Sequence, residues 1–147
     1  MLKEYSYGAV IYKIENEEPL FLLVKSKRSD KWGFPKGHIE ESDTTGLHAA
    51  KREIFEETGI KDMNFVEGFK EEDIYIIEGT RPETKGMTTE KHSIYFLAQT
   101  FSQPLNYDRK EIAQLEWASI ERAVELLYFV NQKNIITKSY RKIKGHI

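Results

Sequence analysis

The chain has 147 residues, 39% of them hydrophobic and 12% aromatic, which suits one folded domain over residues 1–147 with its own core. With 22 basic and 24 acidic residues the formal charge is -2, which argues against binding to nucleic acid over the whole surface and leaves a local basic site open. The absence of cysteine excludes disulfides, thiolate metal sites and a cysteine nucleophile. No apolar run has the roughly 18 residues of a membrane span, and the first five residues lack a signal-peptide pattern. We therefore expect a cytoplasmic protein with no membrane partner.

The N-terminal third predicts a β-hairpin followed by a loop and a helix. Strands are expected over residues 6–14 and 20–24 with a turn at 16–19, and the unbroken apolar run of the second strand indicates burial on both faces. Two glycines and a proline within residues 32–37 exclude a helix there. Ser42, Asp43 or Thr44 then caps a helix that runs to Thr58 and ends at Gly59.

The remaining elements are strands and two helices. We expect strands over residues 64–69, 73–78, 93–98 and 115–118, polar loops over 79–89 and 104–110, and helices over 121–129 and 132–143. The last helix is basic with an Ile/Tyr stripe, a pattern that suits RNA or a membrane surface but more often docks a terminal helix on a sheet. The order of elements predicts an α/β (α+β) fold, with a mixed sheet packed between helices.

The predicted helix before Gly59 carries clustered carboxylates. At about 100° per residue, one stripe should face the core, formed by Leu47, Ala50, Ile54 and Thr58. Glu53, Glu56 and Glu57 share a neighbouring arc and can reach one point beside the helix. They repel one another there, and a shared divalent cation removes that cost; all-oxygen ligands favour Mg²⁺ or Mn²⁺. Arg52 lies one turn before Glu56 and can hold it.

A solvated acidic face is the simpler interpretation of such a helix. The preceding segment argues against it, because a glycine-rich loop carrying Lys36 and His38 suits phosphate groups. A phosphate site beside a carboxylate–Mg²⁺ site indicates phosphoryl chemistry.

These residues resemble the Nudix box, G-x5-E-x7-R-E-U-x-E-E-x-G-U with U aliphatic. The second half matches at every specified position from Arg52 to Ile60. The first half departs, since counting forward from Gly37 places Asp43 at the first Glu position and counting back from Arg52 places Thr44 there. The loop thus carries a one-residue insertion, and Glu40, Glu41 or Asp43 remains open as the substitute carboxylate.

Segments outside the box resemble asymmetric diadenosine tetraphosphate hydrolases, a branch of the Nudix family. The segment 32–38 (WGFPKGH) is similar to their W-x-x-P-K-G-H lead-in, and 91–98 (KHSIYFLA) to the strand that carries a Lys and a Tyr into their nucleotide site. Residues 111–117 resemble their E-x5-W segment, and 126–133 their aromatic helix start beside the base.

The resemblance implies a Nudix-type α/β/α sandwich that hydrolyses a nucleoside diphosphate linked to another group, here diadenosine tetraphosphate to ATP and AMP. It implies Mg²⁺, or Mn²⁺ in its place, at Gly37, Glu53, Glu56, Glu57 and Glu111. Catalysis would fall to Glu57 as a metal ligand and Glu53 as the base, with Arg52 positioning the acids. The nucleotide would contact Lys36, His38, Lys91, Tyr95 and Phe129.

Several alternatives stay open. A second enzymatic hypothesis is another Nudix substrate: a damaged nucleoside triphosphate, a nucleotide sugar or the 5′ triphosphate end of an RNA. A non-catalytic nucleotide sensor is disfavoured by the three intact helix carboxylates, but the loop insertion keeps it open. Alternation along the strand sends either Tyr95 or Phe96 to the cleft. Phe129 either stacks on a base or belongs to the core.

Overall fold

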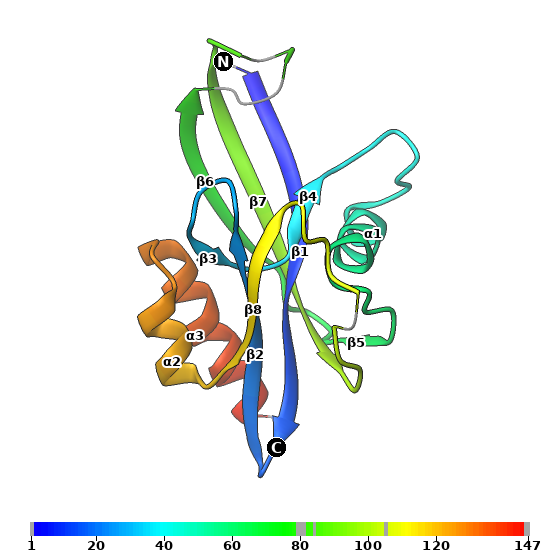
Figure 1. Ribbon diagram of the computed structural model, residues 1–147, viewed down its shortest axis with the longest axis vertical. Helices are drawn as coiled ribbons and strands as arrows, with labels where there is room; N and C mark the ends of the chain where they lie inside the picture. Colours follow the sequence, from blue (N-terminus) through cyan, green and yellow to red (C-terminus); the bar gives the residue numbers. More distant parts are fainter. Residues whose placement is uncertain (1, 79–81, 84, 105, 146–147) are drawn as a thin grey trace.

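The computed structural model describes residues 2–78, 82–83, 85–104 and 106–145, and in them one eight-stranded sheet lies between helices (Figure 1). The strands are β1 (Leu2–Glu15), β2 (Glu18–Ser26), β3 (Trp32–Gly33), β4 (Lys36–His38), β5 (Met63–Phe65), β6 (Glu71–Glu78), β7 (Thr88–Thr100) and β8 (Ile112–Ala118). The helices are α1 (Gly46–Thr58), α2 (Ile120–Leu126) and α3 (Val130–Lys144).

The sheet is mixed, as the sequence predicts. Its central order is β3-β2-β1-β7-β5, with β4 also paired to β1, β6 to β7 and β8 to β2. β1 runs parallel to β7, and the other pairs are antiparallel. β1 changes neighbour along its length, since residues 6–8 pair with β4 and residues 12–15 pair with β2. This change brings the short β4, with its lysine and histidine, beside the N-terminal half of β1.

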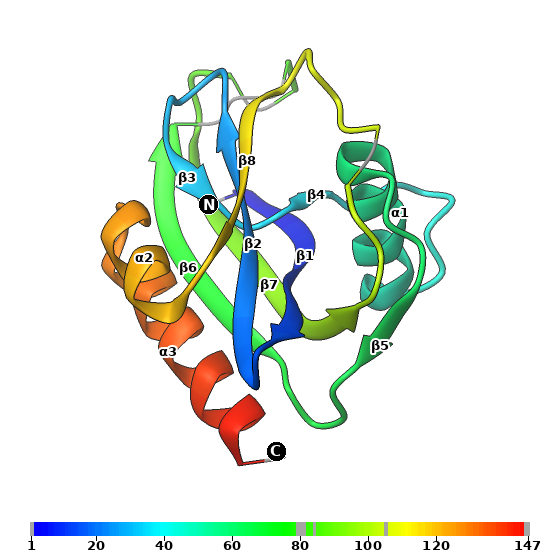
Figure 2. The same cartoon turned by 60° about the horizontal axis from the view of Figure 1, so that its bottom comes forward.

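Helices cover both faces of the sheet. Figures 1 and 2 show α1 on one side and α2 with α3 on the other. Since side chains alternate along a strand, β1 and β2 supply residues to a core on each face. On the α1 face the buried core is Ala9, Ile11, Leu22, Ile54 and Ile60. On the other face it includes Val10, Phe21, Leu23, Tyr95, Leu97, Ile135 and Ile136. The predicted α/β/α arrangement is confirmed.

The hairpin of β1 and β2 forms as expected, with longer strands. The turn narrows to Asn16 and Glu17, both with positive φ (53° and 66°), so β2 already begins at Glu18. An asparagine tolerates this left-handed conformation well, whereas Glu17 adopts it at some cost. The apolar run of β2 is buried on both faces, since Phe21, Leu22 and Leu23 are at most 1% exposed.

Three predicted segments differ in extent. The strand expected at 64–69 ends at Phe65, because the chain turns at Gly68, whose φ is 82°. The polar loop expected at 79–89 ends earlier, since β7 begins at Thr88; residues 79–81 and 84 of that loop, and 105 of the next, lie outside the described residues. The helix expected at 121–129 ends at Leu126, and Phe129 precedes α3 as its N-cap residue.

Helix α1 begins at a different cap from the three that the sequence suggested. Thr45 is the N-cap, and its side-chain oxygen accepts a hydrogen bond from the His48 backbone N–H. Gly59 ends the helix with φ 80°, and its N–H donates to the Phe55 carbonyl. The predicted core stripe is buried at Ala50, Ile54 and Thr58 and half-buried at Leu47. Glu57 is buried as well, which the stripe does not foretell.

Helix α3 docks on the sheet with its apolar stripe, which includes Ile135, Ile136 and Ile143. The docking interpretation of the basic terminal helix is therefore confirmed. In the described part of the chain no helix is long and apolar enough to cross a membrane.

Candidate active site

Arg52 on α1 ties the loop before the helix to the acidic side of the helix. Its Nη1 donates to Glu53 Oε1 at 2.9 Å and to both carboxylate oxygens of Glu56 at 3.2 Å. Its Nη2 donates to the His38 carbonyl at 3.0 Å, which joins the helix to β4. The expected bond between Arg52 and Glu56 is present, but it is one of several. The planar guanidinium thus fixes the acids of α1 relative to the end of β4.

The loop acid that faces Arg52 most directly is Asp43. Its two carboxylate oxygens accept from Nε and Nη2 of Arg52, both at 2.9 Å, in a bidentate pair. The Glu40 backbone N–H and the His48 ring lie against the same carboxylate, and the Asp43 side chain is fully buried. The guanidinium holds the pKa of Asp43 well below its usual range. Glu40 reaches Arg52 as well, at 3.1 Å. Because the Asp43 carboxylate is bonded to Arg52, it does not cap α1, and Thr45 forms the N-cap instead.

Gly37 explains how Glu53 fits against the sheet. Gly37 pairs with Tyr7 and therefore faces α1. A Cβ at this position would lie 2.0 Å from Glu53 Cδ, so only glycine allows the carboxylate to approach β4. Burial raises the pKa of Glu53, while its bond to Arg52 opposes the rise. The Glu53 carboxylate is thus packed directly against the Gly37 backbone.

Glu57, one turn further along α1, lines a cavity of about 620 Å³. It is only 8% exposed, and burial, followed by the charges of Glu53 and Glu111, raises its pKa to about 9; the backbone N–H and the charge of Lys36 oppose the rise. Glu111, just before β8, lines the same cavity. A buried carboxylate with a second carboxylate nearby is a group that a cation would stabilise.

The register of the sheet explains which other side chains reach the cavity. On the strand faces opposite α1, Lys36 lies beside Gly8, and Lys91 pairs with both Glu4 and Tyr75. Both lysines line the cavity, and Lys36 Nζ donates to Ser93 Oγ at 3.1 Å. The cavity extends to the start of α3, where Phe129 is 48% exposed and forms an edge-to-face pair with Tyr128.

The structure brings together only part of the predicted set. Five of the predicted residues line the cavity: Lys36, Glu57, Lys91, Glu111 and Phe129. Arg52, Glu53, Glu56, Gly37 and His38 lie close by on α1 and β4 but outside its wall. Tyr95, expected to contact substrate, is completely buried, with its ring 5.1 Å from the ring of Phe34; it supports the wall from behind. Phe96 is half-buried and packs against the core on the α1 side.

The sequence interpretation missed the far wall of the cavity. Asp73, Asn131 and Gln132 line it, and Asn131 Nδ2 donates to Asp73 Oδ1 at 2.6 Å. Arg28 and Lys31 add cations at the loop after β2. One signal was available, because Asp73 alternates with the exposed Ile74 and Ile76 in β6, and an acid on the inward face of a strand indicates a polar site.

The chemistry of the acids fits a hard divalent cation. Glu57 is buried and Glu53 half-buried, and the pKa of both carboxylates is raised. Glu53 lies against Gly37, Glu56 is on the same helix, and all the groups these residues offer to a metal are oxygens. Within the described ranges, no three His, Asp or Glu side chains already converge into a closed metal cluster.

A mixed sheet between helices, with a carboxylate-bearing helix beside a cation-lined cavity, defines an α+β domain of the Nudix type. Residues 4–139 match the NUDIX domain family. The chain belongs to the Nudix family, and its fold is that of a Nudix hydrolase.

The similar proteins carry names that refer to different substrates. The asymmetrical bis(5′-nucleosyl)-tetraphosphatase of Sus scrofa is 28% identical over 137 residues, 90% of this chain and 86% of that protein. A candidate mRNA-decapping protein of Acanthamoeba polyphaga mimivirus is 32% identical over 126 residues, 82% of this chain and 34% of that protein, so this chain spans about a third of its length. Among solved structures, a Caenorhabditis elegans Ap4A hydrolase in a binary complex is similar with a TM-score of 0.83 at 22% identity, covering 97% of this chain and 98% of that one.

Proposed function

We propose that this chain hydrolyses nucleoside polyphosphates with the help of a divalent metal ion, and that its substrate is diadenosine tetraphosphate, cleaved to ATP and AMP. One observation carries the proposal: a single cavity combines the carboxylates Glu57 and Glu111, the ammonium groups of Lys36 and Lys91, and the exposed ring of Phe129. Carboxylates can hold a metal ion beside the phosphates, ammonium groups can neutralise the polyphosphate, and an aromatic ring can stack on the base. The likeness to the Sus scrofa enzyme over nearly the whole of both chains supports the choice of substrate.

In this proposal Glu53, Glu56, Glu57, Glu111 and the Gly37 carbonyl would hold Mg²⁺, or Mn²⁺ in its place. The ion would supply charge screening for the phosphates and acidification of a water molecule. Glu53 accepts the proton of the attacking water, and the 2.9 Å bond from Arg52 keeps its carboxylate oriented. Because burial raises the pKa of Glu57 to about 9, a cation bound beside it would favour its ionised form at neutral pH.

Lys36 and Lys91 neutralise the polyphosphate within the cavity, and His38 borders it. Phe129 stacks on the adenine, with the Trp32 ring in the same wall. Tyr95 contributes by supporting Phe34, not by touching the nucleotide. The leaving ATP keeps its charge screened by the same lysines until it departs.

The 5′ end of an RNA is the second candidate substrate, and Arg28 and Lys31 in the cavity wall favour it. Cations in a loop at the cavity can follow the phosphates of a chain that continues beyond the first nucleotide. The relative named for mRNA decapping agrees with this alternative.

Product analysis with Mg²⁺ separates these functions. The panel is diadenosine tetraphosphate, a set of nucleoside triphosphates, ADP-ribose and triphosphorylated RNA. ATP plus AMP from the first compound, with little turnover of the others, is the expected result. Preference for another compound keeps the hydrolase and rejects the substrate. Tight nucleotide binding without any turnover would instead identify a sensor.

A further inference from the structure

We propose that Glu4, a buried carboxylate on β1, positions Lys91 and His38 for the polyphosphate chain. It does so without touching the substrate, because Glu4 is absent from the cavity wall whereas Lys91 is part of it. The proposal builds on the proposed function, since it deepens the role of Lys91 in holding polyphosphate.

Glu4 stands out by its burial. It is 5% exposed, and its side chain only 3%, although it lies near the start of β1 between residues that are exposed. Taking a carboxylate out of water is costly unless cations or hydrogen-bond donors lie around it. A glutamate with no role beyond forming part of the strand would keep its carboxylate in water, at a far lower solvation cost. Its burial therefore indicates a role towards neighbouring cations.

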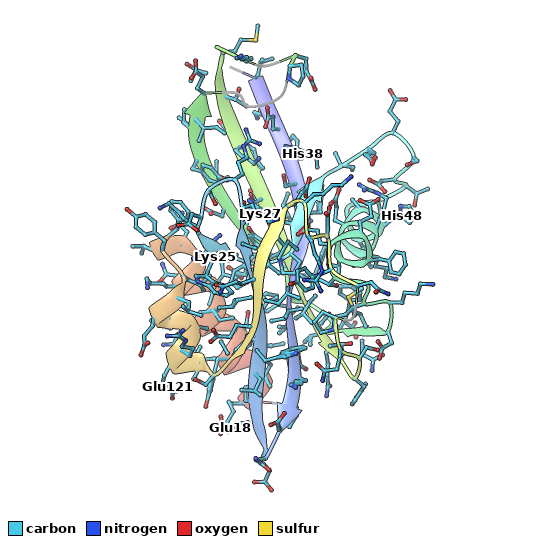
Figure 3. All side chains as sticks on the ribbon, in the orientation of Figure 1. Glu18, Lys25, Lys27, His38, His48 and Glu121 are labelled. Atoms are coloured by element: carbon cyan, nitrogen blue, oxygen red, sulfur yellow. The ribbon has the colours of Figure 1, made fainter. Side chains whose placement is uncertain are left out.

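The register of the sheet delivers those neighbours. β1 lies between β4 and β7 here, and Glu4 is the direct partner of Lys91 in the parallel pair. Ser6, two residues on, is the partner of both His38 on β4 and Ser93 on β7. Partner residues share a face of the sheet, so Glu4, His38 and Lys91 all lie on the cavity side. Figure 3 shows His38 beside β1 and β4, well separated from His48 on α1.

The distances show that one carboxylate oxygen serves both groups. Glu4 Oε2 lies 3.4 Å from His38 Nε2 and 3.9 Å from Lys91 Nζ. Lys91 Nζ and His38 Nε2 are themselves 3.4 Å apart. Glu4 thus supplies the negative charge that lets two basic side chains lie together at the edge of the cavity.

Fixing Lys91 in advance has a direct value for binding. A free lysine side chain loses rotamer freedom when a ligand fixes it, and a lysine that is already held loses less when the ligand arrives. The Lys91 side chain is only 12% exposed, in keeping with a held conformation. Lys36, another lysine of the cavity wall, donates to the neutral Ser93 hydroxyl. Lys91, by contrast, lies beside the Glu4 carboxylate.

A purely electrostatic role for Glu4 predicts the opposite sign from a positioning role. If Glu4 only adds negative charge near the site, its removal strengthens the binding of a polyanion. If Glu4 holds Lys91 in place, its removal weakens that binding even though the site becomes more positive. Glu4→Gln, which keeps size and shape, separates the two.

The experiment measures binding of inorganic tripolyphosphate by titration calorimetry in metal-free buffer, on the full chain. We expect E4Q to bind about tenfold more weakly than the unmodified chain, within the range for freeing one long side chain. E15Q is the matched control, because Glu15 lies on the same strand and pairs with Lys13 at 3.3 Å, but is exposed. We expect E15Q to leave the affinity unchanged.

A double-mutant cycle with Lys91→Met completes the test. In the positioning role, the loss of affinity in E4Q/K91M is smaller than the sum of the two single losses, because both changes remove the same held ammonium group. In turnover of the preferred substrate, E4Q raises KM with kcat nearly unchanged. Tighter or unchanged binding by E4Q, or additive losses in the double variant, would overturn the proposal.

Thermal unfolding of each variant checks that the fold survives. Should E4Q fail to fold, E4D decides, because it keeps the charge and withdraws the carboxylate by one methylene; unchanged tripolyphosphate affinity in E4D would overturn the role of Glu4. The readout needs no turnover. An unmodified chain that binds tripolyphosphate but cleaves no nucleotide contradicts the proposed function alone, and one that binds none contradicts the role of Glu4.

Discussion

The two sides of the cavity are built in different ways. On the α1 side, Arg52 joins Asp43, Glu53, Glu56 and the His38 carbonyl, and no partner is more than 14 residues away in sequence. On the opposite side, Asn131 bonds Asp73 across 58 residues and Lys36 bonds Ser93 across 57. The first side follows from one helix and its loop, whereas the second exists only after the sheet has formed.

This difference suggests a division of labour. The local side carries the oxygen-rich groups of the proposed chemistry, whose spacing a helix fixes to within one turn. The assembled side carries the groups that would contact the nucleotide, and these can vary without disturbing the helix. Changes on the α1 side should lower kcat, and changes on the far side should raise KM.

The largest effect should come from Glu57→Gln. Removing the buried carboxylate lowers turnover with Mg²⁺ by at least about a hundredfold, the scale of a lost acid–base or metal-ligand group, while the fold survives. Steady-state kinetics and circular dichroism check this. The matched control is E71Q, since Glu71 forms a surface ion pair with Lys138 at 2.9 Å and should keep its activity. An E57Q variant as active as E71Q would refute the assignment.

Asp43→Ala tests whether the loop acid supports the local side. It removes two 2.9 Å bonds from Arg52, so we expect the free energy of unfolding to fall by about 2 kcal/mol, as for bonds to charged groups. Urea denaturation measures the change. With Arg52 less constrained, kcat should fall while KM stays similar. The exposed Glu41 in the same loop gives the control, and equal stability of D43A and E41A would show that Glu40 suffices to hold Arg52.

Phe129→Ala tests the assembled side. Loss of one stacking ring should raise KM for the preferred nucleotide about tenfold, because stacking on an aromatic side chain is worth about 1–3 kcal/mol per base. The value of kcat should change little. Phe101, 74% exposed and outside the cavity, provides the control F101A. If F129A lowered kcat and left KM unchanged, the division between the two sides would not hold.

The smallest expected effect is a dependence on pH of the stabilisation that Mg²⁺ gives to the folded chain. The folded pKa of Glu57 is about 9, above the roughly 4.3 of an unfolded glutamate, so the metal-free folded state binds more protons between these values. The contribution of Glu57 to stability therefore falls as pH rises through that window, and Mg²⁺, which needs the ionised form, should stabilise more at pH 8 than at pH 6. Thermal unfolding with and without Mg²⁺ measures both effects. E57Q should abolish this pH dependence of the Mg²⁺ effect; if it persists, it arises elsewhere.

The sequence predicted helices and strands accurately where a single hydrophobic periodicity, that of a strand or of a helix, dominates the segment. The apolar run of β2 and the stripe of Ala50 and Ile54 gave the right structure, because alternation and helical spacing are local properties. Strand ends and caps were less accurate. Local spacing makes Asp43 a candidate N-cap. In the structure its carboxylate instead accepts hydrogen bonds from the Arg52 guanidinium, and Thr45 is the N-cap.

The sequence by itself determined the acidic helix, its arginine and the glycine that ends it, since each depends on neighbours within a few turns. Only the tertiary structure decided that Glu57 shares a cavity with Glu111, that Tyr95 lies behind that cavity, and that Asp73 and Asn131 close its far side. These placements depend on strand register and on burial. Both are set by pairings between residues far apart in the chain, which no local spacing encodes.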